Sequence, residues 1–263
     1  MTDAQYHVLQ EWFKTYVRSF REPDPADQEN LDLKEQHTRR VCEAARRIAT
    51  GLGLTDNDRR LATVTALFHD LGRFRQYREF RSFRDADSVN HARLSLLELH
   101  GRRILHGLPA AERRLIGRAI ILHNRISLPG RLDPATLLHC QLIRDADKVD
   151  ILRVMAEHFR MPAGRRNPVV TLGLESDGEV REEVYNRLFA GRGMSYTAMR
   201  NTNEFKVLLL SWVFDCHFRP TFELLREQND ISSIAASLPD TPAARRARDF
   251  ALAAIDHRLR EPG

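Results

Sequence analysis

The sequence predicts an all-α fold, a helical bundle with a C-terminal helical extension. Apolar residues recur at three- and four-residue steps over most of the chain, which is the period of helices that pack on one face. The alternation typical of strands is confined to one short stretch near 169–180. The 263 residues contain no internal repeat and no Pro/Gly/Ser linker long enough to divide them, so we expect a single domain over 1–263.

The first clear helix is predicted over 29–50, with His37 on its inward face and glycines directly after it. A second helix begins near Asp56 or Asn57, either of which can cap it, and ends in the tripeptide His69-Asp70-Leu71. Gly72 then provides the expected stop, because glycine is favoured just beyond a helix C-terminus.

The remaining chain alternates between one irregular segment and further helices. Residues 73–88 are polar and arginine-rich without a clear period, so an irregular segment is expected there. A small β-hairpin is predicted near 169–180, with Ser176-Asp177-Gly178 as its turn. The same helical period as above predicts helices over 90–99, 110–123, 134–159, 204–228 and 243–259.

The positive charge of the chain comes almost entirely from arginine. Lysine and arginine number 41 against 36 acidic residues, giving a net charge of +5, and four of the 41 are lysines. A hydrophobic share of 42% with 29% charged residues is typical of a globular protein and excludes wholesale disorder. Many arginines form scattered doublets on predicted helix faces, so we expect no nucleic-acid partner.

The compartment can also be predicted. No apolar run reaches the ~18–20 residues of a membrane span, and the N-terminus lacks the features of a secretion signal. The three cysteines, Cys42, Cys140 and Cys216, are far apart and form no metal-binding or disulfide pattern. We therefore expect a cytoplasmic protein without a membrane partner, and any homodimer is expected to form through the C-terminal helices.

Seven side chains with metal-binding chemistry lie in predicted helices or at their ends. Imidazole and carboxylate are ligands of hard or borderline divalent ions, and no thiol belongs to the set. Neighbouring helix residues point about 100° apart, so an adjacent pair can converge on ions over the end of its helix. They are His37, the adjacent pair His69-Asp70, His91, His123, and the two carboxylates of the run 144–148, Asp145 and Asp147.

The order of His37, then His69-Asp70, then Asp147 resembles the HD-domain superfamily of metal-dependent phosphohydrolases. The added His91 and His123 resemble the subset of that superfamily with two metals. The match covers about residues 30–160 and includes the strings HDLGRF, DSVNHA and RDADKVDIL. The resemblance implies a helical HD core over this range, followed by a C-terminal extension over about residues 161–263.

The resemblance also implies how metal would be held. One ion is expected at His37, His69, Asp70 and Asp147, with Asp145 as the fallback if the register is off by two. A second ion is expected at His91 and His123, with Asp70 bridging the two ions. One or two divalent ions are thus implied, and the ligand types do not distinguish Mn, Fe, Mg, Co, Ni and Zn.

The activity implied is hydrolysis of a phosphate ester of a small molecule, with nucleotides as the expected class. A divalent ion lowers the pKa of bound water from about 15.7 towards about 7, so a metal-bound hydroxide would attack phosphorus. The expected catalytic residues are Asp70, Arg73 and Lys148, the last two as cations beside the phosphate. Arg73 follows His-Asp-Leu-Gly, and Lys148 follows Asp147.

A cluster of arginines begins three residues after Asp70. Arginine binds phosphate through a planar fork, so the cluster favours a funnel for an anionic substrate over the alternative, a solvated loop. One acid, Glu79, accompanies the five arginines, which are Arg73, Arg75, Arg78, Arg81 and Arg84.

Two substrates are disfavoured and two alternative functions stay open. The motif of guanosine-tetraphosphate hydrolases is absent, because Gly72 and Arg73 follow Asp70-Leu71, and the Gly-Tyr-Pro motif of cyclic-di-GMP phosphodiesterases is also absent. The six-ligand pattern equally resembles that of HD-type di-iron oxygenases. A non-catalytic nucleotide-binding regulatory module, signalling through the helix at 204–228, is the further alternative.

Overall fold

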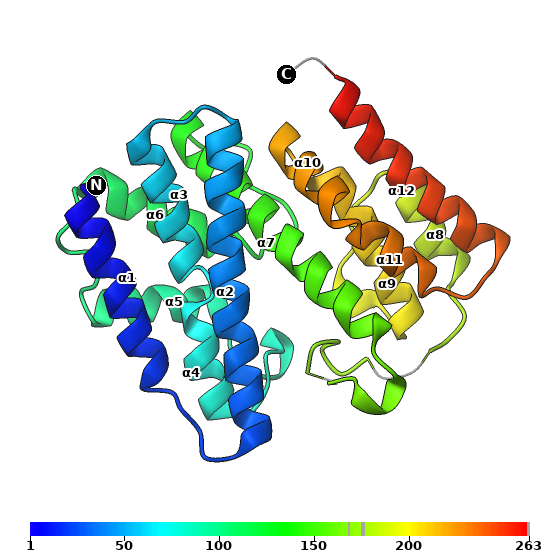
Figure 1. The fold of residues 1–263 in the computed structure, drawn as a ribbon, viewed down its shortest axis with the longest axis horizontal. Helices are drawn as coiled ribbons and strands as arrows, with labels where there is room; N and C mark the ends of the chain where they lie inside the picture. Colours follow the sequence, from blue (N-terminus) through cyan, green and yellow to red (C-terminus); the bar gives the residue numbers. More distant parts are fainter. Residues whose placement is uncertain (168, 175–176, 262–263) are drawn as a thin grey trace. The chain divides into compact units, whose positions relative to one another are not determined.

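The computed structural model describes residues 1–167, 169–174 and 177–261. These ranges are mainly helical and contain no strand, which confirms the predicted all-α fold. The chain groups into two compact units, 1–147 and 148–263, with the boundary inside one long helix (Figure 1). The predicted single domain and its core boundaries stay predictions. Within the described ranges, no helix is both long and apolar enough to cross a membrane.

The first unit is a bundle in which α2 lies beside α3, and α4 packs on α5 (Figure 1). Its core includes aromatic contacts, since the ring of Phe13 lies 6.4 Å from that of Phe68 and 6.1 Å from that of Phe74. The elements in chain order are α1 (Asp3–Arg18), α2 (Pro25–Gly51), α3 (Asp56–Phe68), α4 (Leu71–Phe80), a 3₁₀ segment (Asp85–Asp87), α5 (His91–Gly101), α6 (Ala110–Leu122) and the start of α7 (Pro134–Arg160).

The helix starts in this unit follow ordinary capping chemistry. The Asp24 carboxylate accepts hydrogen bonds from the backbone N–H groups of Ala26 and Asp27, with Pro25 at the first helical position of α2. At α3 the cap is Thr55, one residue before the nearer predicted cap, Asp56, and its hydroxyl accepts from the N–H of Asp58.

Two expectations around the second helix are wrong. Helix α4 occupies much of the segment predicted to be irregular, and Gly72 lies inside α4 instead of stopping α3. Helix α4 is polar, so its periodicity is weak, but an ion pair between Arg75 and Glu79 and its packing against α5 support it. The chain turns between α3 and α4 at His69 and Asp70.

The second unit contains several shorter helices and the long terminal α12. The helix predicted over 204–228 is interrupted, because a 3₁₀ segment follows α9 and a new helix begins with Pro220 in its first turn, where proline is tolerated. After the end of α7 and a 3₁₀ segment (Ala163–Arg165), the elements are α8 (Glu182–Phe189), a 3₁₀ segment (Tyr196–Ala198), α9 (Thr202–Ser211), a 3₁₀ segment (Trp212–Asp215), α10 (Arg219–Gln228), α11 (Asp230–Ala236) and α12 (Pro242–Arg260).

The β-hairpin predicted near 169–180 does not form in the described part of that stretch. Its turn residue Ser176 lies outside the described residues. Beyond it, the carbonyl groups that a strand ladder would use accept side-chain hydrogen bonds instead. The Asn203 amide donates to Gly178 O at 2.9 Å, and the Asn201 amide donates to Glu179 O at 3.0 Å.

Candidate metal centre

The first unit brings all six predicted metal-binding side chains together. His37 lies within α2, and His69 and Asp70 form the junction between α3 and α4. His91 is the first residue of α5, His123 caps the end of α6, and Asp147 lies on α7. The four histidines and Asp70 are buried. Ligand atoms from the six residues form three groups, each spanning less than 4.8 Å.

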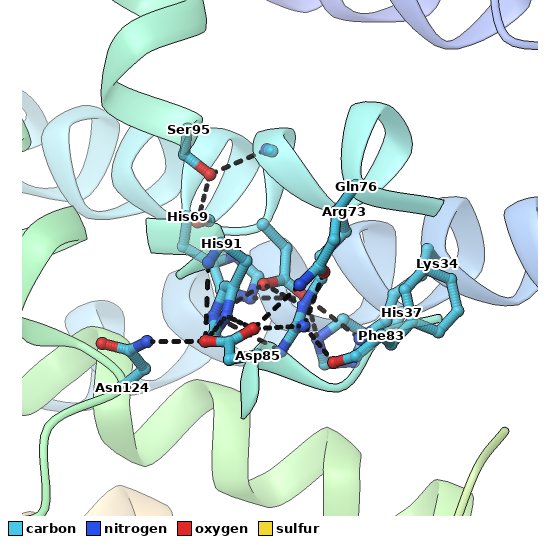
Figure 2. Close-up of polar contacts among 12 residues, drawn as sticks. Lys34, His37, His69, Arg73, Gln76, Phe83, Asp85, His91, Ser95 and Asn124 are labelled. Atoms are coloured by element: carbon cyan, nitrogen blue, oxygen red, sulfur yellow. Dashed lines mark hydrogen bonds and ion pairs between the residues drawn. The ribbon is translucent and has the colours of Figure 1, made fainter. Parts of the chain in front are cut away.

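The α3–α4 junction is held against α5 by a close backbone approach. A Cβ atom at Gly72 would lie 2.5 Å from His91 O and 2.6 Å from Ser95 N, so only glycine fits there. The Ser95 hydroxyl accepts from Gly72 N–H at 2.8 Å and donates to His69 O at 2.9 Å (Figure 2). These contacts fix His69, Asp70 and His91 relative to one another.

The two oxygens of Asp70 face different pairs of histidines. Oδ2 lies 3.6 Å from His37 Nε2 and 3.8 Å from His69 Nε2. Oδ1 lies 3.4 Å from His91 Nε2 and 4.0 Å from His123 Nε2. Asp70 therefore stands between two sets of ligand atoms.

Asp147 completes the set that contains His37 and His69. Its Oδ1 lies 3.2 Å from His37 Nε2 and 3.6 Å from His69 Nε2. The neighbouring carboxylate of Asp145 is also buried, but it is not part of these groups of ligand atoms.

In three of the histidines, Nδ1–H donates a hydrogen bond to a carbonyl or carboxylate oxygen. The other ring nitrogen, Nε2, is then an unprotonated acceptor that faces the cluster. His69 Nδ1–H donates to Ala66 O at 2.7 Å, and His123 Nδ1–H donates to Ile120 O at 2.6 Å. His91 Nδ1–H donates to Asp85 Oδ2 at 2.7 Å. A carbonyl or carboxylate partner on the second ring nitrogen is the usual arrangement of metal-ligating histidines, because it fixes the ring and its tautomer.

The resulting arrangement of acceptors fits a bound cation. The Nε2 atoms of His91 and His123 lie 3.1 Å apart, and with both protons on Nδ1 their lone pairs face one another. In the described part of the chain, His69 Nε2 and Asp147 Oδ1 are buried without a hydrogen-bond partner. Buried acceptors are costly when left unsatisfied, and a divalent ion would satisfy them.

The charge states of the site also suit metal binding. Burial opposes ionisation of Asp70, but Lys34, His69, Arg73 and His91 hold its pKa well below the ordinary value. Burial likewise opposes ionisation of Asp147, whose pKa His37 and His69 hold well below the ordinary range. Burial, with nearby His91 and His69, lowers the pKa of His123 to about 3. At neutral pH the acids are therefore ionised and this imidazole is neutral, as metal ligands must be.

Comparison with known protein families decides the classification. Residues 35–165 match the family model of the HD domain. Through these residues, the chain belongs to the HD-domain superfamily. HD domains are all-α and form a superfamily of metal-dependent hydrolases. No curated protein and no solved structure matches this chain significantly.

Beside its predicted ligands, the HD domain positions two charged residues that sequence reasoning missed. Lys34 Nζ lies 3.0 Å from Asp70 Oδ2, and its place three residues before His37 on one helix could have signalled this. Asp85 orients His91 and also pairs with Arg73 Nη1 at 2.9 Å (Figure 2). Burial opposes ionisation of Asp85, but His91 and Arg73 lower its pKa to about 2. Asp85 lies in a segment without helical periodicity, so its spacing from the predicted ligands did not indicate a role in the site.

The predicted catalytic cations of the HD domain have defined partners. The Arg73 guanidinium bonds Gln76, Asp85 and Phe83 O, and its Nε lies 3.5 Å from Asp70 Oδ1. Lys148, which begins the second unit, donates from Nζ to Asp215 O at 2.7 Å and lies equally close to Asp215 Oδ2. Catalytic roles for Arg73 and Lys148 stay predictions.

The funnel predicted from the arginine cluster is wrong for four of its five members. Their guanidinium groups pair with carboxylates of the first unit, one of them the buried Glu98, so they are not held open for an anion. Arg75 pairs with Glu79 and Glu98, Arg78 with Glu22, Arg81 with Glu22 and Asp27, and Arg84 with Asp87.

Proposed function

We propose that this chain is a divalent-metal-dependent phosphohydrolase that cleaves a phosphate ester of a small molecule, with nucleotides as the substrate class. The observation that carries the proposal is the convergence of histidine Nε2 acceptors and two ionised carboxylates in one buried cluster. Membership of a superfamily of metal-dependent hydrolases supports the same reading.

The ligand sets would divide between two positions. His37, His69, Asp70 and Asp147 would hold one ion, and His91 and His123 would hold a second, with Asp70 shared between them. A bound divalent ion supplies Lewis acidity that activates water and stabilises charge on a phosphoryl oxygen. In the reaction, water adds to phosphorus, the ester P–O bond breaks, and the leaving oxygen takes up a proton.

The surrounding residues would set orientation and charge. Asp85 holds the His91 ring with Nε2 toward the cluster, and Ser95 ties the α3–α4 junction to α5. Three carboxylates, Asp70, Asp85 and Asp147, outweigh Lys34 and Arg73, so the cluster favours a cation. Arg73 would stabilise the phosphate from the His91 side, where its Nη2 lies 3.5 Å from His91 Nε2.

The test combines metal analysis with phosphate release. Chelator-treated protein is reloaded separately with Mn²⁺, Mg²⁺, Co²⁺, Fe²⁺ and Ni²⁺ and assayed on phosphomonoesters, nucleotides and cyclic dinucleotides. We expect metal-dependent release of phosphate or nucleotide, lost in His69→Ala together with bound metal. His139→Ala is the matched control, because His139 is a buried histidine of the first unit outside the cluster. Inactivity with every metal and substrate contradicts the proposal.

The same experiments separate the alternatives. An HD-type di-iron oxygenase would retain iron and consume oxygen with its substrate, without releasing phosphate. A regulatory module would bind nucleotide without turnover, whichever metal is supplied.

A further inference from the structure

A pocket of about 500 Å³ opens in the first unit between the start of α5, the end of α6 and the segment that follows α6. Its volume lies within the range of small-molecule sites. Four arginines line it together with apolar side chains such as Ile121 and Pro129. We call it the arginine pocket, after Arg93, Arg118, Arg125 and Arg131.

The four guanidinium groups differ from most arginines of this unit. Elsewhere in the first unit, arginines such as Arg39, Arg46 and Arg60 pair with nearby carboxylates. Among the described residues, no carboxylate pairs with any arginine of the pocket, and all four side chains are exposed. The carboxylate of Asp133, whose Oδ1 accepts from Thr136 N–H, is near enough to Arg118 to interact with it electrostatically, but among the described residues it forms no ion pair with that arginine. Four like charges around one hollow repel one another, so an anion there would be stabilised.

The arginine pocket adjoins the candidate metal centre. Asn90 lines it and caps α5 directly before His91, while Leu122 and Asn124 line it on either side of His123. The Asn124 amide also donates to Asp85 Oδ2 at 3.4 Å, and Asp85 in turn orients His91 (Figure 2). A molecule that reaches from the pocket toward His91 and His123 would therefore meet both sites.

We propose that the arginine pocket binds the outer phosphate or phosphates of a substrate that carries two or more phosphates, while another of its phosphates lies at the metal centre. This inference rests on the proposed phosphohydrolase function and narrows its substrate class. A phosphate group carries about −1.5 to −2 charges at pH 7, so four arginines match about two phosphates. The planar fork of arginine suits phosphate, and the apolar side chains can pack against an uncharged part of the same molecule.

Binding to metal-free protein tests the pocket separately from catalysis. Inorganic tripolyphosphate and orthophosphate are titrated calorimetrically into chelator-treated protein at low and physiological salt. Wild type is expected to bind tripolyphosphate at least about tenfold more tightly than orthophosphate, with affinity falling as salt rises. The double variant Arg118→Gln/Arg131→Gln is expected to lose at least about tenfold of the tripolyphosphate affinity.

Two further variants guard against a trivial result. Arg114 lies on α6 one turn before Arg118, is exposed and does not line the pocket. Arg114→Gln should therefore change the affinity for tripolyphosphate by less than about twofold. Arg93→Gln/Arg125→Gln removes the other two charges and should repeat the loss. Thermal unfolding confirms that each variant is folded.

Each outcome assigns the result to one proposal. Equal tripolyphosphate affinity in wild type and both double variants overturns the inference, and so does an equal loss in Arg114→Gln. Tighter binding of a single-stranded oligonucleotide than of tripolyphosphate also overturns it. Arginine-dependent binding without phosphate release from any ester would support the pocket and count against the proposed hydrolysis. Release of phosphate from simple esters without tripolyphosphate binding would support the proposed hydrolysis and count against the pocket.

Discussion

Replacing Gly72 with alanine should destabilise the first unit, although alanine is the better helix former. The added Cβ would lie 2.5 Å from His91 O and 2.6 Å from Ser95 N, whereas ordinary contacts begin near 3.4 Å. Both neighbours are backbone atoms of α5, so no side chain can swing away. Helices α4 and α5 would have to separate by about 0.9 Å.

The free-energy cost follows from three terms. Forcing extra volume into a tight contact costs about 1–3 kcal/mol. Strain on the two hydrogen bonds of the Ser95 hydroxyl, to Gly72 and His69, costs up to about 1 kcal/mol each. The higher helix propensity of alanine relative to glycine offsets up to about 1 kcal/mol of this loss. The midpoints of these ranges give an expected net loss of about 2–3 kcal/mol in the free energy of unfolding.

The assay is urea unfolding followed by the fluorescence of Trp12 in a Trp212→Phe background. Trp12 stacks on Tyr16 and contacts Phe68, so its signal reports the first unit. The control is Gly101→Ala, because nothing lies within 4 Å of a Cβ atom at the end of α5. The control should be neutral or stabilised by up to about 1 kcal/mol. A Gly72→Ala protein as stable as this control would refute the close-approach argument.

Three further predictions concern residues outside the ligand set. Burial raises the pKa of Asp230 to about 6, above the ordinary value of 3.8, so the folded state holds its proton more tightly. The stability of the protein should therefore fall as pH rises from about 4 to about 6. Measured by urea unfolding, Asp230→Asn should stabilise the protein by about 1–3 kcal/mol at pH 8 but little at pH 4. Equal effects of the substitution at both pH values would contradict this prediction. Arg144 donates hydrogen bonds to the carbonyls of His123, Arg125 and Ile126. Arg144→Met should therefore lower the free energy of unfolding by about 2–4 kcal/mol and weaken metal binding, as measured by calorimetry. A variant that unfolds at the wild-type urea concentration would show that these hydrogen bonds are dispensable. Lys148→Met should lower kcat with metal content unchanged, and a variant that loses only stability would limit Lys148 to its pairing with Asp215.

The sequence predicted the parts of the fold whose helices have strong apolar periodicity. Helices α2, α6, α7 and α12 lie close to their expected ranges, because apolar residues recur at helical steps along each of them. The polar α4 was missed because packing on α5 and surface ion pairs support it, and neither leaves an apolar pattern. The break between α9 and α10 was missed because apolar residues continue through it, although Pro220 marks the new start.

In the candidate site, features carried by a local sequence pattern could be predicted, and features formed only by folding could not. The six potential ligands could be found because adjacent and ordered His and Asp residues are unusual on helices. The arginine pocket could not be found, since its arginines come from α5, from α6 and from the segment that follows α6, and only folding brings these parts together. The local arginine cluster at 73–84 was misleading because acids distant in sequence, such as Glu22 and Asp27, neutralise part of it.

Metal titration of one chelator-treated preparation, with phosphate release followed in the same samples, tests the central claim most directly. The account predicts that divalent ions bind to the His and Asp cluster and that hydrolysis of a phosphorylated substrate returns in proportion to bound metal. Asp70→Asn should abolish both, because its two oxygens face both pairs of histidines. Hydrolysis that persists without metal, or tight metal binding that survives in Asp70→Asn, would contradict the account.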